Sequence, residues 1–247
     1  MKRKYLITLS LFTLVFLASF TDLADKKYQS AVVLELFTSQ GCSSCPSADD
    51  LLGKVTETEK NQNVFALSYH VDYWNYIGWK DPFSKKKYTE RQRAYAQKFR
   101  DNQIYTPAVV VNGQEHFVGS NRSKMYAKIK EYKNKVSSYA ISLDAKKKTS
   151  NSFQFNYTID GNISNTKARI VLAIKERTTN VKRGENARRT LKNYNIVVDE
   201  NYLKEFKKTG NYTVNFPEIV SATDELMVFL ILENDQQDIL SASRLDI

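Results

Sequence analysis

The chain has 247 residues, with 37 lysines and arginines against 27 aspartates and glutamates, and a formal net charge of +10 at pH 7. Three of the basic residues, Lys2, Arg3 and Lys4, open the sequence, so the remainder carries +7. The other basic residues form short scattered runs outside any recognisable nucleic-acid module. We therefore expect no nucleic-acid partner.

The basic start is followed by an uncharged apolar stretch, Tyr5 to Phe20, which is typical of an export signal. We predict that residues 1–24 are a signal peptide or an N-terminal anchor, and that the protein is extracytoplasmic, either periplasmic or secreted. The stretch is shorter than the roughly 20 residues of a membrane span, and no later run approaches that length. We expect no stable membrane insertion beyond such an anchor.

Between residues 27 and 136, apolar runs with the character of strands alternate with helical patterns. The expected elements are strand Ala31–Phe37, helix Pro46–Val55, strand Val64–His70, helix Lys86–Arg100, strands Ala108–Val111 and His116–Val118, and helix Arg122–Val136. This order predicts a three-layer α/β domain with an aromatic-rich insertion at about residues 71–101.

From residue 138 to residue 247 the strong signals are strands with polar connections. The expected strands are Ala140–Leu143, Phe153–Ile159, Arg169–Lys175, Asn195–Val198, Tyr212–Phe216, Leu226–Leu232 and Ile239–Ser243. Seven such runs predict a separate all-β sandwich domain, to which Glu200–Lys207 adds one short helix.

The two cysteines of the chain, Cys42 and Cys45, lie between the first strand and the first helix. A cysteine at a helix N-terminus meets unpaired N–H groups and the positive end of the helix dipole, which favour the thiolate. The second cysteine is placed to resolve a mixed disulfide. A structural disulfide, a pair of metal ligands and two inert buried thiols are the alternatives at this point.

Other residues of the predicted first domain qualify for the same site. Glu35 lies in an apolar strand, where burial without a cation raises a carboxyl pKa, and we expect it beneath the cysteines as a proton acceptor. The alternative is an edge position that faces solvent or pairs with a lysine. His70 ends the second strand, where it either stabilises a thiolate, binds a metal or caps the insertion. Trp74 and Trp79 are candidates for a wall that faces the substrate.

A proline, Pro107, opens the apolar run Ala108–Val111, which ends in an Asn-Gly turn. A Cys-x-x-Cys on a strand-to-helix turn with a later Thr-Pro before a hairpin resembles the thioredoxin fold. In that superfamily the proline is cis and lies against the redox cysteines, which implies that Thr106 and Pro107 hold the backbone of an extended substrate.

Longer motifs restrict this resemblance to one part of the thioredoxin superfamily. They are Gly-Cys-Ser-Ser-Cys-Pro at residues 41–46, His-Val-Asp-Tyr-Trp at 70–74, Gly-Trp-Lys-Asp-Pro-Phe at 78–83, Arg-Gln-Arg-Ala-Tyr at 91–95 and Arg-Gly-Glu-Asn at 183–186. Together they resemble an exported bacterial thioredoxin-like family of unknown function that carries the Gly-Cys-Ser-Ser-Cys-Pro signature. The resemblance implies a fold but no assigned reaction.

From these residues we predict a thiol–disulfide oxidoreductase in which Cys42 exchanges, Cys45 resolves and Glu35 handles the proton. Its partners are protein thiols or disulfides, or a small thiol; the direction of exchange and the oligomeric state stay open. We expect no cofactor and no bound metal. Two alternatives are a Cu(I)-binding protein that uses both thiolates and His70, and a non-catalytic binding protein with a structural disulfide.

Overall fold

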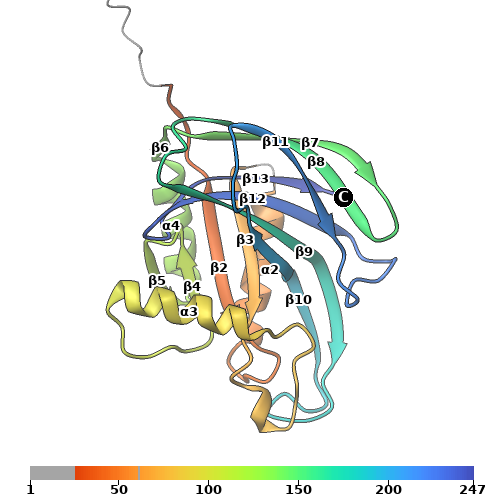
Figure 1. Ribbon diagram of the computed structural model, residues 1–247. Helices are drawn as coiled ribbons and strands as arrows, with labels where there is room; N and C mark the ends of the chain where they lie inside the picture. Colours follow the sequence, from red (N-terminus) through yellow and green to blue (C-terminus); the bar gives the residue numbers. More distant parts are fainter. Residues whose placement is uncertain (1–25, 61) are drawn as a thin grey trace, which may run out of the picture.

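The computed structural model describes residues 26–60 and 62–247. The predicted signal peptide or anchor at residues 1–24 lies outside this part of the chain. Within it, no helix is both long enough and apolar enough to cross a membrane. Figure 1 shows three helices arranged around a large sheet, with further strands packed beside it.

The helices are α2 (Pro46–Thr58), α3 (Lys86–Phe99) and α4 (Arg122–Lys133), with a short 3-10 helix at Asn75–Ile77. The strands of the first half are β1 (Tyr28–Gln29), β2 (Val32–Thr38), β3 (Val64–His70), β4 (Ala108–Val111), β5 (Glu115–Val118) and β6 (Val136–Ser137). Those of the second half are β7 (Ala140–Lys148), β8 (Ser152–Asp160), β9 (Thr166–Asn180), β10 (Thr190–Tyr202), β11 (Thr209–Asn215), β12 (Leu226–Asn234) and β13 (Ile239–Asp246).

The largest sheet has eight strands in the order β13-β12-β9-β10-β3-β2-β4-β5. Strand β3 pairs in parallel with β2 and also with β10, where Ile196 lies opposite Ser68. A strand from the second half of the chain therefore occupies the free edge of β3 and continues the sheet. The remaining pairs along this sheet are antiparallel.

The predicted fold class is wrong. We expected a three-layer α/β thioredoxin-like domain followed by a separate all-β sandwich, whereas the described residues are mostly strand and share one sheet across both halves. The cause is visible in β9, where Ala168–Ile174 is buried on both faces and needs neighbours on both sides. The division of the chain near residue 137 stays a prediction.

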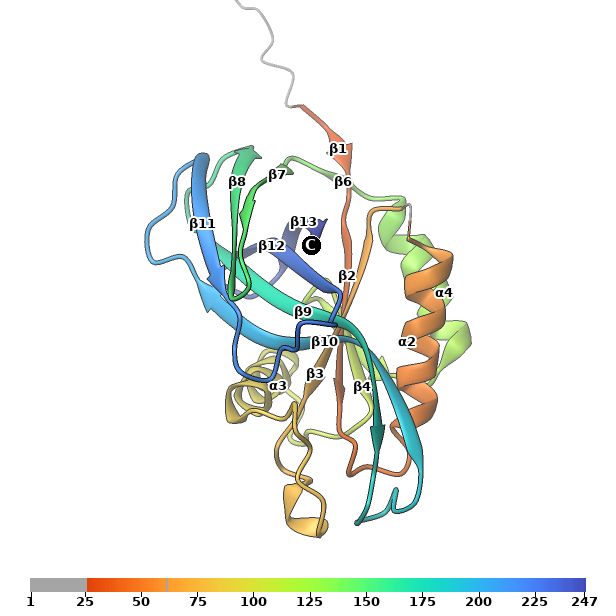
Figure 2. The ribbon, with the colours of Figure 1, turned by 90° about the vertical axis from the view of Figure 1, so that its right-hand side faces the viewer.

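Alternate residues of β2 point to opposite faces of the sheet, as in any strand. Leu34 and Leu36 pack against α2 and α4, while Val33 and Phe37 pack against α3 and residues of β9 and β12. Figure 2 shows this arrangement, with α2 and α4 on one side of the sheet and α3 on the other. A side chain on β2 therefore faces either the helix that follows the cysteines or the opposite layer.

The second half of the chain forms a further layer. Strands β11, β8 and β7 make a three-stranded sheet that lies beside β9 and β12 (Figure 2). Its Phe153 and Phe155 pack against residues of β9 and β12. The predicted helix at Glu200–Lys207 is wrong, because β10 continues to Tyr202 and pairs there with Arg169 of β9. Tertiary pairing outweighs local helix propensity at this position.

Candidate functional site

The two cysteines form a disulfide with a Cα–Cα distance of 5.4 Å, on the turn between β2 and α2. Pro46 is the first helical residue, a position that suits proline because the N–H it lacks has no helical partner. Cys45 precedes it, and its carbonyl accepts hydrogen bonds from the N–H groups of Ala48 and Asp49 at 2.9 and 3.1 Å. The pair is thus at the positive end of α2.

A second loop covers this turn. The β9–β10 turn (residues 181–189) reaches the same end of the molecule as the cysteine turn (Figures 1 and 2). The Asn186 side chain donates hydrogen bonds to the carbonyls of Cys42 and Gln40 at 2.9 and 3.0 Å, and the Glu185 carboxylate accepts one from Ser43 N–H at 2.9 Å. Both cysteines are accordingly 0% exposed, although Ser43 between them is exposed.

Trp79 and Trp74 pack around the same turn with their indole N–H groups bonded inside the protein. Trp79 donates to Gln40 Oε1 at 3.1 Å, and Trp74 donates to Thr106 Oγ1 at 2.7 Å. A Cβ on Gly41 would lie 3.2 Å from Trp74 Cβ, so Trp74 bridges the cysteine turn and Thr106. The structure thus brings both predicted tryptophans to the loop that carries the cysteines.

The Thr106–Pro107 peptide bond is cis. Pro107 lies beside Gly119, where a Cβ would be 3.4 Å from Pro107 Cβ and 3.3 Å from Ala48 Cβ in the first turn of α2. Pro107 therefore lies close to the turn of α2 that follows the cysteines.

Glu35 is buried as predicted but not beneath the cysteines. It shares the face of β2 that carries Val33 and Phe37, away from α2. Arg91 donates to it at 3.0 and 3.2 Å, and Arg169 Nη2 is 3.0 Å from its Oε1. Burial opposes its charge, but the two guanidinium groups outweigh burial and lower its pKa to about 2. We expected a raised pKa, and the two arginines, distant in sequence, reverse the sign.

Asp49, an acidic residue that the sequence analysis missed, lies on the α2 face of the sheet. Its carboxylate accepts a hydrogen bond from Thr38 Oγ1 at 3.0 Å, and its side chain is buried. The signal was present in the sequence, since Asp49 follows Cys45 by four residues and both occupy one face of the helix.

His70 lies at the end of β3 and contacts Asp81, not a cysteine. Its Nδ1 is 2.7 Å from Asp81 Oδ2, and both side chains are fully buried. Asp81 also accepts the N–H of Gln40 at 2.8 Å, so it holds the loop that carries Cys42. Among the described residues, no group of three or more histidine, cysteine, aspartate or glutamate side chains is arranged to bind a metal ion.

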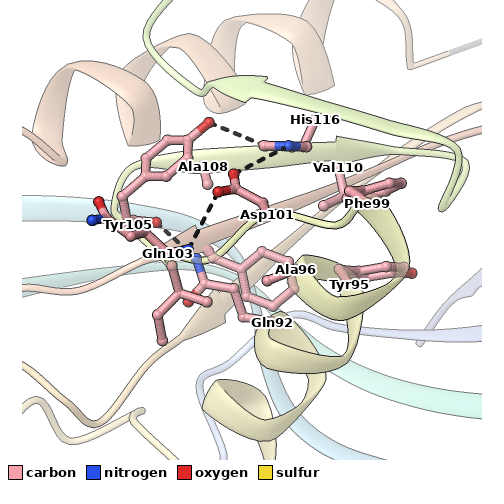
Figure 3. Close-up of a pocket in the computed structure, with 12 residues that line it drawn as sticks. Gln92, Tyr95, Ala96, Phe99, Asp101, Gln103, Tyr105, Ala108, Val110 and His116 are labelled. Atoms are coloured by element: carbon pink, nitrogen blue, oxygen red, sulfur yellow. Dashed lines mark hydrogen bonds and ion pairs between the residues drawn. The ribbon is translucent and has the colours of Figure 1, made fainter.

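A small, open pocket lies on the other face of the sheet, between α3 and the β4–β5 hairpin (Figure 3). Its wall is largely apolar and includes Phe99 and Tyr105, with His116 next to Asp101 at 3.6 Å. Neither cysteine lines it. Tyr105 and Ala108 of its wall flank Thr106–Pro107, so the pocket adjoins the proline segment from the side opposite to α2.

Comparison with known proteins identifies a family and similar solved structures. A family model described as "Protein of unknown function (DUF1223)" matches residues 33–232. Among solved structures, protein AGR_C_4864 from Agrobacterium tumefaciens is similar at 31% identity and a TM-score of 0.62, covering 88% of this chain and 95% of that chain. HBP35 of Porphyromonas gingivalis shares the fold at 15% identity and a TM-score of 0.60, covering 89% of this chain and 76% of that one. No curated protein matches this chain.

Proposed function

This chain belongs to the DUF1223 family of proteins of unknown function, and we propose that it exchanges disulfides with partner thiols through Cys42 and Cys45. The observation that carries the proposal is the disulfide itself, closed across a four-residue turn at the N-terminus of α2. The helix dipole there favours a thiolate, the form that attacks and leaves in disulfide exchange.

The environments of the two sulfurs suggest different roles. Cys42 is next to the exposed Ser43 and Ser44, whereas Cys45 directly precedes α2, one face of which is buried. When the cysteine pair is oxidised and the partner is reduced, the Cys42 thiolate attacks a partner disulfide, and one partner thiolate leaves. Cys45 thiolate then attacks Cys42 Sγ, the second partner thiolate leaves, and two electrons have passed to the partner. The reverse sequence oxidises a partner dithiol.

Access to Cys42 depends on the β9–β10 turn. Three hydrogen bonds hold this turn over the cysteine turn: the Asn186 amide donates two, and the Glu185 carboxylate accepts one. Each neutral bond from Asn186 contributes only about 1 kcal/mol net, and Glu185 is exposed to solvent, so local opening is far easier than unfolding. We infer that a partner reaches Cys42 when the β9–β10 turn is displaced.

Thr106 and Pro107, with the neighbouring Trp74, are the proposed surface for the backbone of a partner, because they lie beside the first turn of α2. We assign Trp79 to the residues that cover the cysteine turn, since its indole N–H donates to Gln40 in the loop that leads to Cys42. Glu35 does not enter the proposal, because it faces α3 and the arginines. We assign the activity to an extracytoplasmic compartment, where disulfides persist and to which the predicted signal at residues 1–24 would direct the chain.

The full burial of both sulfurs favours a second candidate, a permanent structural disulfide in a binding protein. Equilibration of the purified protein with glutathione buffers separates the two. A midpoint potential between about −270 and −120 mV supports exchange, and one below about −300 mV supports a structural bond.

A trapping experiment then identifies the partner. With Cys45→Ser, the mixed disulfide on Cys42 cannot resolve and should accumulate on exposure to oxidised glutathione or to extracytoplasmic extract. Cys42→Ser is the matched control and should trap much less. Equal trapping by both variants, or by neither, would contradict the assigned roles.

A further inference from the structure

Three buried titratable side chains lie together beneath the cysteine turn, from three different elements: Asp49 on α2, His70 at the end of β3, and Asp81 in the following loop. Their exposed fractions are 3%, 0% and 1%. Asp81 binds both His70 and the N–H of Gln40, and Asp49 binds Thr38. Such a cluster is rare in an interior unless the groups serve each other or a reaction.

The cluster contains polar atoms without a well-formed hydrogen bond among the described residues. They are Asp49 Oδ1 and His70 Nε2, together with Nδ2 of the neighbouring Asn193 on β10. Asn193 acts on Asp49 as a hydrogen-bond partner that lowers its pKa, so these two groups face each other. His70 uses Nδ1 for Asp81, which leaves Nε2 without a partner, and a buried polar atom of this kind calls for a functional reason.

The cluster is directly connected to Cys45. Asp49 lies one helical turn after Cys45, on the same face of α2, and its N–H donates to the Cys45 carbonyl. Asp81 in turn holds the loop that precedes Cys42, through Gln40. No other buried carboxylate occupies the α2 face of β2 among the described residues, because Glu35 lies on the opposite face.

The electrostatics agree with this geometry. Burial raises the pKa of Asp49 to about 7, helped by Asp81 and opposed by His70, Thr38 and Asn193. Burial opposes the charge of His70, but Asp81 and Asp49 outweigh it and raise the His70 pKa. These are the groups that face Asp49 from β2, β3, the loop after β3 and β10. The cluster therefore gains or loses a proton near neutral pH.

We propose that Asp49, buried together with His70 and Asp81, is the proton acceptor for Cys45 in the exchange reaction. This inference rests on the proposed function and deepens it. In the mixed disulfide, Cys45 S–H transfers its proton to the Asp49 carboxylate. The Cys45 thiolate attacks Cys42 Sγ, the Cys42–Cys45 bond forms, and the Cys42–partner bond breaks with loss of the partner thiolate. In the reverse direction, Asp49 returns the proton to Cys45 as that sulfur leaves.

The test uses Asp49→Asn in the full chain, with Asp50→Asn as the matched control. Asp50 is the next residue of α2 and is exposed. The reduced protein is mixed with excess oxidised glutathione, and the release of the second glutathione is followed between pH 5 and pH 10. The wild-type rate should rise through an inflection near pH 7. Asp49→Asn should lose that inflection and be about 100-fold slower at pH 7.

At pH 10, hydroxide deprotonates Cys45 directly, so Asp49→Asn should approach the wild-type rate. A merely structural role for Asp49 would slow exchange at every pH and leave the inflection in place. Asp50→Asn should match the wild type throughout. An Asp49→Asn profile identical to that of the wild type would overturn the proposal while leaving the exchange function intact, whereas a wild-type protein that never reacts with glutathione would refute the exchange function itself.

A second measurement needs no variant and covers the case in which Asp49→Asn fails to fold. The midpoint potential of the wild-type pair is measured against glutathione between pH 5 and pH 9. A proton that moves between Cys45 and the cluster makes the pKa of the cluster differ between the two redox states, so the plot should bend between pH 6 and pH 8. A straight line across that range would overturn the proposal.

Discussion

Glu35 provides the sharpest test of how this fold is stabilised. Its carboxylate is fully buried between Arg91 and Arg169, and also accepts a hydrogen bond from Tyr95. These partners lower its pKa from an ordinary 4.5 to about 2. That difference corresponds to about 3 kcal/mol of stability, because each pKa unit is worth about 1.4 kcal/mol.

The sign of the pH dependence follows from the lowered pKa. The contribution of Glu35 is complete above pH 4.5, where the unfolded carboxyl is ionised too, and it is lost as the pH falls from about 4.5 to about 2. Glu35→Gln removes the negative charge and leaves two buried guanidinium groups with one anion fewer. At pH 7 we expect a loss of at least about 3 kcal/mol in the free energy of unfolding.

Urea unfolding at pH 7, 4 and 3 measures this loss. Glu57→Gln is the control, since Glu57 is an exposed partner of Lys60 and its replacement should leave the free energy of unfolding near the wild-type value. The destabilisation caused by Glu35→Gln should shrink towards pH 3, and the midpoint potential of the cysteine pair should stay at the wild-type value. A loss below about 1 kcal/mol at pH 7, or a shifted potential, would refute the reasoning.

Three further predictions concern the disulfide, its cover and one turn. Asn186→Ala removes two hydrogen bonds to the cysteine turn, so the disulfide should be reduced by dithiothreitol about tenfold faster; an unchanged rate would mean that the β9–β10 turn does not control access. The double variant Cys42→Ser/Cys45→Ser opens a four-residue loop and should lose about 2 kcal/mol in chemical denaturation, and a loss well above that would point to a mainly structural disulfide. Gly113→Ala should lower the melting temperature markedly, because Gly113 has φ +67° and its new Cβ would lie 1.9 Å from the carbonyl oxygen of Gln237; a melting temperature equal to the wild-type value would show that this contact relaxes freely.

Local signals in the sequence predicted much of the first half of the chain. Proline at position 46 and the apolar run before the cysteines act over a few residues, so the strand, the turn and the helix appear where expected. The disulfide between Cys42 and Cys45 is confirmed for the same reason, since two cysteines one turn apart meet without help from the rest of the chain. The roles of the predicted site residues stay proposals.

The prediction of the fold class was wrong because the sequence pattern of a strand does not indicate which other strands it pairs with. Nothing in the run around Ile196 indicates that it pairs with Ser68 of β3, yet that one contact joins the two halves into a single sheet. We predicted only short strands for β9 and β10, because the polar residues at the ends of both strands resemble loops. Pairing between the two strands extends both of them.

The sequence by itself determined where α2, α3 and α4 begin, where the cysteine turn lies and which two sulfurs bond, because these depend on neighbours within about one helical turn. Tertiary structure decided which charges meet. Arg91 and Arg169, both distant from Glu35 in the sequence, turn it from a candidate proton acceptor into a carboxylate that stays ionised at neutral pH. Burial, opposed by the charge of His70, raises the pKa of Asp49 to about 7, the direction of shift that we had expected for Glu35. Both outcomes depend on desolvation and on distances between residues far apart in the chain, which no local pattern encodes.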